Sequence, residues 1–312
     1  MILASLDVSD VRNLEHVTLV PAPGFNLFYG DNGAGKTSLL EAISILSTGR
    51  SFRAGKISTV IRADRDQLVI SAQLKDAANT VAGSRIGIQR GRKETTVRID
   101  GQNINRVSAL AKALPCVIIS TSNHELIERS PTERRSFVDW LLFHVEPGAH
   151  NLFQRYKNAL QQRNAELKNN TSDELLAVWH PELVETGEQI DAGRRRILEK
   201  FGEKMEQVLD GWSESLKPSF QYRPGWPEDI SLADALSRTD HCRRRGTTTA
   251  GPHRADILIR SGSQESRYVL SRGQQKLLAA QMRLVQIEMY TDEHQHSPVV
   301  LFDDLPSELD QN

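Results

Sequence analysis

The chain has few cysteines and no excess of positive over negative charge. These two shortages exclude some classes of protein. Two cysteines in 312 residues, Cys116 and Cys242, are too few for a disulfide scaffold and do not have metal-site spacing. This favours a reducing compartment in which both are buried thiols. Because 39 Lys and Arg residues stand against 40 Asp and Glu residues, no global basic field indicates a nucleic-acid partner. Any surface that binds nucleic acid must therefore be local.

The sequence also lacks a long apolar run. No stretch approaches the roughly 18 apolar residues of a membrane span. The opening residues MILASLDVSD lack the basic segment that precedes the apolar core of a secretion signal. We therefore expect a cytoplasmic protein without a membrane partner. Hydrophobic residues make up 38% of the chain, enough for one large or two medium domains.

The strongest motif lies in residues 25–46, FNLFYGDNGAGKTSLLEAISIL. Within it Gly30, Gly35, Lys36 and Thr37 satisfy G-x-x-x-x-G-K-[ST] without a mismatch. The five residues before the first glycine form an apolar run that predicts a buried strand, and apolar residues after the motif recur at helical spacing. The motif therefore has the strand, loop and helix context of a phosphate-binding loop.

This loop predicts a nucleoside-triphosphate site. A glycine-rich loop lets consecutive backbone N–H groups point at phosphate oxygens, and the helix N-terminus adds partial positive charge. Lys36 is expected to reach the β- and γ-phosphates and to serve catalysis, and Thr37 is expected to hold Mg²⁺. The predicted binding residues run through the loop: Gly30, Asp31, Asn32, Gly33, Ala34, Gly35, Lys36, Thr37 and Ser38.

Two further motifs lie near the other end of the chain. Residues 270–276, LSRGQQK, form a small-residue turn that opens a long helical run, which is a second phosphate-binding geometry. Residues 299–302, VVLF, predict a buried strand that delivers Asp303 and Asp304 at its C-terminal edge. Two carboxylates there suit Mg²⁺ coordination and water polarisation.

The rest of the chain divides into a strand-rich part and a helical part. Strands are predicted in residues 1–20 around a turn at 10–13, and in 67–75, 84–90, 95–99, 115–120 and 256–259, with Asp100-Gly101 as a hairpin signal. Helices are predicted in 130–144, in 150–168, from 172 towards 216 and in 275–290, with a Pro- and Gly-rich connector at 217–231. The helical patterns at 150–168 and from 172 towards 216 predict, most simply, a pair of antiparallel helices. Its basic run Arg194 to Arg196 is a candidate for contact with DNA phosphates, although a charge run opposite an apolar stripe is more typical of a solvated face.

Together these motifs resemble those of the ABC ATPase class. Residues 30–37 are similar to Walker A, 270–276 to the signature motif, 299–304 to Walker B and 307–310 to the D-loop. The separation of Walker A from Walker B exceeds that of a transporter nucleotide-binding domain, yet it is far shorter than in SMC-type proteins with long coiled coils. Three further stretches make the chain similar to the RecF family of bacterial recombination mediators over essentially its whole length: RSFR at 50–53, GPHR at 251–254 and SRGQQK at 271–276.

The resemblance implies an α/β fold. It is an ABC-type P-loop ATPase head, with a mixed sheet and an antiparallel β lobe, carrying an inserted helical arm. The expected domains are an N-terminal head part at 1–125, the arm at 126–239 and a C-terminal head part at 240–312.

The resemblance also implies a composite site. In this class two heads bind ATP between them, so the Walker motifs of one face the signature of the other, here Ser271, Arg272, Gly273 and Gln274. Asp303 would then hold Mg²⁺ with Thr37, and Asp304 would stand where a catalytic Glu usually polarises water. Arg12 and Arg53 are similar to the N-terminal and R-loop arginines that contact nucleotide in SMC-type heads.

Two departures from the family pattern stand out. Asn123, His124 and Glu125 occupy the place of the usual Q-loop glutamine. The sequence runs only two residues beyond Asp310, whereas family members continue into a strand and a histidine-bearing switch. The sequence therefore indicates a truncated or unusually short C-terminus and impaired hydrolysis.

The function that the resemblance implies is recombination mediation. Such proteins form ATP-dependent homodimers on DNA near single-strand/duplex junctions. They help RecO and RecR to load RecA at single-strand gaps during repair, the SOS response and replication restart, with weak DNA-stimulated ATPase activity. The residues themselves supply local basic clusters, at 50–53, 90–93, 134–135 and 243–245.

Two alternatives from other classes stay open. A transport-coupled nucleotide-binding domain is disfavoured by the missing membrane segment and the long helical insertion. A non-hydrolysing structural head that joins partners when ATP binds is consistent with the short C-terminus.

Overall fold

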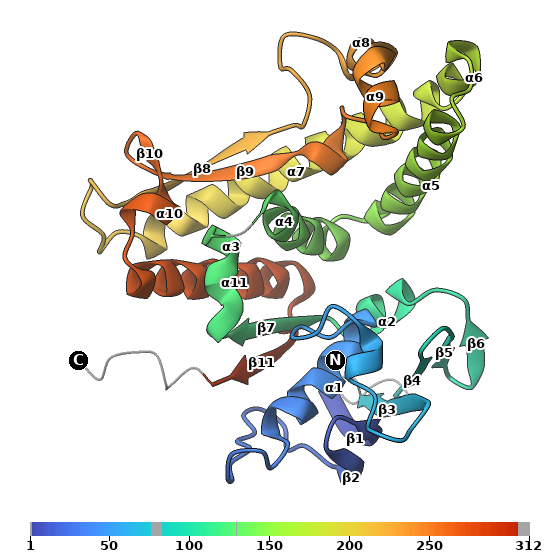
Figure 1. Ribbon diagram of the computed structural model, residues 1–312. Coiled ribbons are helices and arrows are strands. Elements are labelled where there is room, and N and C mark those ends of the chain that lie inside the picture. Colours follow the sequence, from blue (N-terminus) through green and yellow to red (C-terminus); the bar gives the residue numbers. More distant parts are fainter. Residues whose placement is uncertain (1, 76–82, 129, 305–312) are drawn as a thin grey trace. The chain divides into compact units, whose positions relative to one another are not determined.

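The computed structural model describes residues 2–75, 83–128 and 130–304. The chain divides into two compact units. The first unit consists of Met1–Thr121 together with His294–Asn312, and the second unit is Ser122–Glu293, so the second is inserted into the chain of the first. Figure 1 labels their helices and strands.

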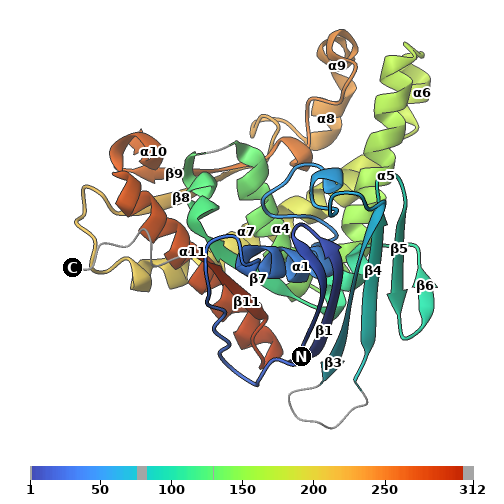
Figure 2. The same cartoon turned by 60° about the horizontal axis from the view of Figure 1, so that its bottom comes forward.

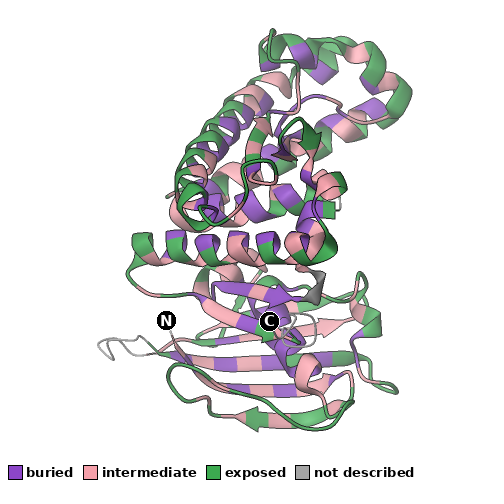
Figure 3. Cartoon of the chain, turned by 90° about the vertical axis from the view of Figure 1, so that its left-hand side faces the viewer, coloured by how far each residue is buried: buried purple, intermediate pink, exposed green. Residues whose placement is uncertain are grey.

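A six-stranded antiparallel sheet makes up much of the first unit (Figure 2). Its spatial order is β2-β1-β3-β4-β5-β6, and the strands are β1 (Ile2–Val11), β2 (Leu14–Leu19), β3 (Gln67–Lys75), β4 (Arg85–Gly91), β5 (Thr95–Ile99) and β6 (Gln102–Ile104). Buried and exposed residues alternate along the strands, as Figure 3 shows, which is the pattern of a sheet with one face in the core. Asp100 and Gly101 have φ of 50° and 80° and join β5 to β6. The predicted hairpin is confirmed, because a two-residue turn of this type needs positive φ at both positions.

The helix after the glycine loop, α1 (Lys36–Thr48), is the central helix of the first unit. It contacts β1, β3 and β4 of the antiparallel sheet and also both strands of a parallel pair, β7 (Cys116–Ser120) and β11 (Val299–Asp303). Ten consecutive residues of α1, from Ser38 to Ser47, are buried. The helix ends at Gly49, whose φ of 69° is the left-handed conformation in which glycine commonly stops a helix. The short helices α2 (Ser108–Ala113) and η1 (Ile57–Thr59) complete this unit.

One predicted strand is absent. Residues 25–29 form no strand, and Phe25, Leu27 and Tyr29 expose 80%, 70% and 88% of their surface, so the prediction of a buried strand here is wrong. A strand needs a neighbour to satisfy its backbone N–H and C=O groups. Among the residues that the structure describes, no strand pairs with this segment.

The second unit is mainly helical. Its elements are η2 (Thr121–His124), which begins at the last residue of the first unit, α3 (Glu125–Glu128), α4 (Pro131–Val145), α5 (Ala149–Lys168), α6 (Asp173–Ala177), α7 (His180–Val208), β8 (Pro218–Arg223), α8 (Leu232–Ser237), α9 (Thr239–Arg245), η3 (Pro252–Arg254), β9 (Asp256–Ser261), β10 (Gln264–Glu265), α10 (Ser266–Val269) and α11 (Arg272–His294). Helices α5 and α7 pack along each other, as the helical pattern predicts. No helix within the described residues is both long and apolar enough to span a membrane.

Two predictions about the second unit need correction. The third helix is not continuous from 172 towards 216, because the chain leaves helical hydrogen bonding at 178–179 and α7 ends at Val208. The expected connector at 217–231 contains strand β8, which pairs with β9 from Pro218↔Ser261 to Arg223↔Asp256. A partner about 40 residues away supplies this pairing, and local composition does not reveal it.

The compact units differ from the expected division at 126 and 240. Residues 240–293 belong to the second unit, because α11 buries Met282 and Val285 in the same core as Phe137 of α4 and Phe201 of α7. The functional division into two head parts and an arm stays a prediction.

Candidate nucleotide-binding site

The glycine loop before α1 depends on backbone conformations that favour glycine. Gly30, Gly33 and Gly35 have φ of 146°, 84° and 101°. At Gly35 the space is also closed, because a Cβ atom would lie 2.6 Å from Leu14 Cδ2. A side chain here would displace that of Leu14, and the positive φ would be strained for any residue other than glycine. The sequence therefore has glycine where the loop turns into the helix.

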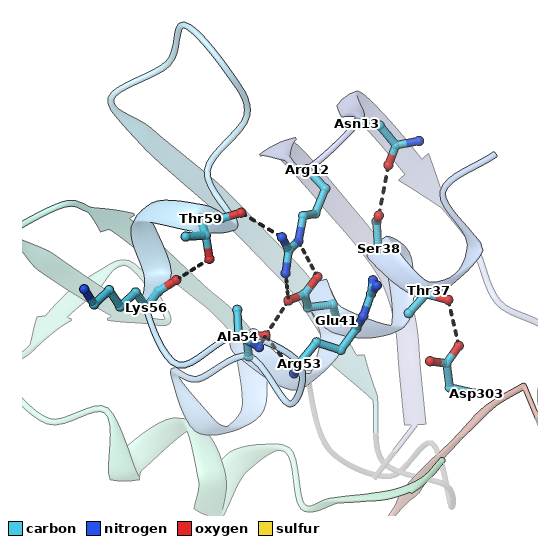
Figure 4. A network of polar contacts seen from close by, with 11 residues as sticks. Arg12, Asn13, Thr37, Ser38, Glu41, Arg53, Ala54, Lys56, Thr59 and Asp303 are labelled. Carbon is cyan, nitrogen blue, oxygen red and sulfur yellow. Dashed lines mark hydrogen bonds and ion pairs between the residues drawn. The ribbon is translucent and has the colours of Figure 1, made fainter. Parts of the chain in front are cut away.

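A neighbouring hairpin holds this loop in place. The Asn13 side chain, from the β1–β2 turn, donates from Nδ2 to the Gly33 carbonyl oxygen at 2.7 Å and accepts from Ser38 Oγ at 2.9 Å. One amide thus connects the middle of the loop to the first turn of α1, as Figure 4 shows for the Ser38 contact. Sequence reasoning missed Asn13 as a site residue, although it did predict the turn in which Asn13 lies.

Lys36 lies at the start of α1 and bonds back to the loop. Its ammonium group donates to the carbonyl oxygens of Gly30 at 2.7 Å and Asp31 at 2.9 Å. An ammonium has three donors, so one remains for an oxygen outside the loop. The first turn of α1 carries no acidic residue, which leaves the partial positive charge of the helix N-terminus uncompensated. The loop can therefore attract an anion such as a triphosphate.

Thr37 and Asp303 meet directly. Thr37 Oγ1 donates to Asp303 Oδ1 at 2.9 Å, although the two residues are 266 positions apart in the chain. The contact exists because β11 pairs with β7 in parallel and brings Asp303 to the edge of the pair beside α1 (Figure 4). A hydroxyl and a carboxylate at a phosphate-binding loop fit Mg²⁺, which usually takes one or two protein ligands and completes its shell with phosphate oxygens and water. Asp304 follows with φ of 56° and is exposed.

A second polar network is built around Glu41, in the middle of α1 (Figure 4). Arg12 donates from Nε and Nη2 to the two carboxylate oxygens of Glu41, both at 2.9 Å, and from Nη1 to the Thr59 carbonyl oxygen at 2.8 Å. The hydrogen bonds that Arg12 donates to the Glu41 carboxylate raise the pKa of Arg12. Arg53 is exposed on the loop after α1. The predicted contacts of Arg12 and Arg53 with nucleotide stay predictions.

The signature-like turn lies in the second unit and caps α11. The Ser271 N–H donates to Gln274 Oε1 at 2.9 Å, and the Gln274 N–H donates to Ser271 Oγ at 3.3 Å. This reciprocal pair is a capping box, which the S-x-x-Q spacing signals in the sequence. Arg272 and Gly273 between them are exposed. The role of these four residues in a composite nucleotide site stays a prediction.

The Q-loop and D-loop positions add little to this geometry. At the Q-loop position, His124 Nε2 on η2 lies 3.7 Å from Glu128 Oε2 on α3. Residues 307–310, the predicted D-loop, lie outside the described residues.

Several basic residues that the sequence offered for DNA phosphates are engaged within the second unit. Arg194 is buried against Asp139, at 2.8 Å. Each of the others contacts a carboxylate: Arg134 with Asp256, Arg195 with Asp191, Arg196 with Glu146 and Arg243 with Asp173. Their first role is to hold the helices of this unit together.

Known proteins resemble this chain over nearly its full length. The family model described as RecF/RecN/SMC N terminal domain matches residues 2–312. Two curated relatives are named DNA replication and repair protein RecF. That of Thioalkalivibrio sulfidiphilus is 37% identical over 99% of this chain and 86% of its own length. That of Pseudomonas paraeruginosa is 40% identical over 100% of this chain and 85% of its own length.

Solved structures agree with the sequence relatives. The recombination mediator RecF bound to ATP, described as part of the RecFOR pathway, superposes with a TM-score of 0.88 at 27% identity, covering 99% of this chain and 86% of the other. An Smc head domain from Pyrococcus furiosus superposes with a TM-score of 0.53 at 16% identity over 99% of this chain and 83% of its own. The second likeness concerns the fold alone. The predicted fold of an ABC-type ATPase head with a helical insertion is confirmed.

Proposed function

The chain belongs to the RecF/RecN/SMC N-terminal domain family, and from this premise we propose that it is an ATP-dependent, DNA-binding recombination mediator of the RecF kind. The proposed role is in DNA repair and replication. The observation that carries the proposal is the contact of Thr37 with Asp303 beside the glycine loop, because a hydroxyl and a carboxylate in this position are suited to hold Mg²⁺ next to a triphosphate. The solved structure of RecF that resembles this chain is a complex with ATP.

In the proposed mechanism the first unit binds the triphosphate. Backbone N–H groups of residues 30–38 and the Lys36 ammonium receive the phosphate oxygens, and Asn13 keeps the loop in shape. Thr37 and Asp303 would hold Mg²⁺, which supplies charge neutralisation at the β- and γ-phosphates when bound. Asp304 would orient the attacking water.

Hydrolysis is proposed to be slow. An Asp side chain is one methylene shorter than the Glu that usually occupies the position of Asp304, so its carboxylate reaches the water less well. We expect Asp304→Glu to raise single-turnover phosphate release above that of the wild type. An unchanged or lower rate would count against this role for Asp304.

A second chain is proposed to complete the site. The turn of Ser271 to Gln274, whose first three residues are exposed, would contact the γ-phosphate bound to the partner, so ATP would hold a homodimer together. DNA would then lie against basic residues that are not engaged with carboxylates. Within the described part of the first unit, no ion pair with a carboxylate is formed by Arg50, Arg90, Arg92 or Lys93.

The cellular setting follows from the same proposal. A mediator of this kind would act in the cytoplasm on gapped DNA or single-strand/duplex junctions. RecO and RecR would be its partners, and RecA would be loaded indirectly.

Binding to gapped duplex DNA tests the function. Affinity is measured with ATP, with a non-hydrolysable analogue and without nucleotide, each over a salt series, for the wild type and for Lys36→Ala. We expect tighter binding with either nucleotide, a steep decrease with salt and no nucleotide effect in the variant. Binding that is absent or insensitive to salt would overturn the DNA role. Phosphate release in parallel distinguishes an ATPase from a structural head that binds ATP without hydrolysing it.

A further inference from the structure

Glu41 is a buried carboxylate in the middle of the nucleotide-binding helix. It lies four residues after Thr37, so both side chains project from the same face of α1. Its side chain is fully buried, with 0% exposed. A buried charge is unfavourable unless other groups pair with it. Its partners therefore show what this residue does.

Two chain segments converge on Glu41. Arg12 from the β1–β2 turn makes a two-point ion pair with the carboxylate, and Ser51 Oγ, from the loop after α1, donates a hydrogen bond to Oε1. Arg12 also reaches the carbonyl oxygen of Thr59 in η1. The carboxylate thus ties the hairpin and the loop to the helix that carries Thr37.

Ser51 also links Glu41 to the backbone at Arg53 and Ala54. The Ser51 hydroxyl oxygen accepts from the Arg53 N–H at 3.0 Å and from the Ala54 N–H at 2.8 Å. The backbone of Arg53 is therefore fixed, while its side chain is exposed. In Figure 4 that side chain extends from the loop toward the start of α1, where Thr37 lies.

We propose that Glu41 is a positioning residue for nucleotide binding: it holds Ser51 and Arg12 so that the Arg53 guanidinium stands beside the phosphate-binding end of α1. A guanidinium held in place loses less freedom when it binds a phosphate oxygen, and this improves affinity without a new contact. In this arrangement Arg12 holds the Glu41 carboxylate, and Glu41 in turn holds Ser51 of the loop after α1. The inference rests on the proposed binding of ATP at the glycine loop.

The test is a double-mutant cycle for ATP affinity, measured with a fluorescent ATP analogue and competing ATP. Ser51→Ala breaks the link to Arg53 and leaves the Arg12–Glu41 pair intact, and Glu41→Gln removes the charge. We expect each to weaken binding about three- to tenfold, the worth of one hydrogen bond. In an Arg53→Ala background neither should weaken it further, because residues that act as a unit are not additive.

Ser47→Ala is the matched control. Ser47 lies on the same helix and donates one buried hydrogen bond, at 2.7 Å, to the Leu114 carbonyl oxygen, away from the loop. It should leave ATP affinity unchanged even if it lowers thermal stability. Ser51→Ala binding ATP like the wild type, or losing as much affinity in the Arg53→Ala background as alone, would overturn the proposal.

Amide hydrogen exchange gives a readout that does not need nucleotide. Ser51→Ala and Glu41→Gln should speed exchange at the Arg53 and Ala54 amides and leave that of β7 unchanged. Unchanged exchange at both amides would refute the positioning role whatever the variant binds. If exchange changes as expected but the wild type binds no ATP, then Glu41 and Ser51 do position Arg53, and it is the proposed function that fails.

Discussion

Lys36 makes two hydrogen bonds, and both acceptors are carbonyl oxygens of the loop that it serves. Lys36→Ala should therefore cost little stability, within about 0.5 kcal/mol as for other surface changes. It should weaken ATP binding about ten- to a hundredfold, since hydrogen bonds from a charged donor contribute about 1.5–3 kcal/mol. Fluorescent-nucleotide titration and thermal unfolding measure the two effects. Lys93→Ala, another cation of the first unit, is the control and should change neither.

Asp303 offers a test of the metal site alone. Asp303→Asn keeps an oxygen that can accept from Thr37 Oγ1, but it removes the charge that would hold Mg²⁺. Nucleotide binding measured in EDTA should be unchanged, whereas the gain in affinity on adding Mg²⁺ should be lost. A variant that still responds fully to Mg²⁺ would show that Asp303 is no ligand.

At the scale of elements, two ion pairs on α7 differ in burial and should differ in energy. Arg194 exposes 4% of its side chain and pairs with Asp139, whereas Arg196 exposes 56% and pairs with Glu146. Removing one partner of a buried pair leaves an uncompensated charge and costs about 3–5 kcal/mol. Removing an exposed pair costs about 1 kcal/mol or less. Chemical denaturation of Asp139→Ala and Glu146→Ala should show this order, and equal losses would contradict it.

The turn of η3 is connected to α5 through a neutral histidine. His253 Nε2 lies 3.0 Å from the Thr248 carbonyl oxygen, which can only accept, so Nε2 carries the hydrogen and Nδ1 accepts from the Tyr156 hydroxyl at 2.7 Å. Burial lowers the pKa of His253 to about 4, opposed by the bond to Thr248 and assisted by the charges of three arginines: Arg254, Arg135 and Arg163.

This histidine should make stability depend on pH. Between about pH 6.5 and pH 4 the histidine binds a proton in the unfolded chain but not in the folded chain. The contribution of His253 to the free energy of unfolding is therefore complete above pH 6.5 and decreases as the pH falls, by up to about 1.4 kcal/mol per pH unit. His253→Gln should flatten that part of the curve of unfolding free energy against pH. His241→Gln, at an exposed histidine, should not. Parallel curves for His253→Gln and the wild type would refute the assignment.

Sequence reasoning succeeded where a motif carries its own geometry and failed where a distant partner decides the structure. The G-x-x-x-x-G-K-[ST] spacing predicted the glycine loop, and Thr37 and Asp303 lie in contact as expected, while their roles in binding stay predictions. The Asp100-Gly101 turn needs nothing beyond its own two residues. Strand β8 was predicted as a connector because its partner β9 is remote in sequence. Glu41 was missed because an acid in an apolar helix gives no sign of its partners. Residues 25–29 show the opposite error, since apolar composition does not create a neighbouring strand.

At the scale of the whole molecule, the signature-like turn offers a way to separate nucleotide binding from dimer formation. A Cβ atom at Gly273 would meet nothing within 4 Å. An aspartate there also suits the first turn of α11. Gly273→Asp should therefore fold normally and bind ATP like the wild type as a monomer, yet repel the γ-phosphate held by a partner.

Sedimentation with a non-hydrolysable ATP analogue tests this. The wild type should shift towards a dimer, and Gly273→Asp and Lys36→Ala should each stay monomeric. A mixture of the two variants should recover part of the dimer, because the Lys36→Ala chain supplies an intact signature to the intact loop of the other. Dimer formation by Gly273→Asp alone would contradict a composite site.

The bond between Thr37 and Asp303 also has a consequence for biosynthesis. Its two ends are 266 residues apart, so at about 5–20 residues per second the ribosome adds Asp303 roughly 15 to 50 s after Thr37. During that interval the glycine loop has no carboxylate from β11 beside it. A nascent chain can then acquire the loop that grips phosphate well before the group proposed to hold the metal. The part of the site proposed to hold the metal would therefore form well after the loop itself.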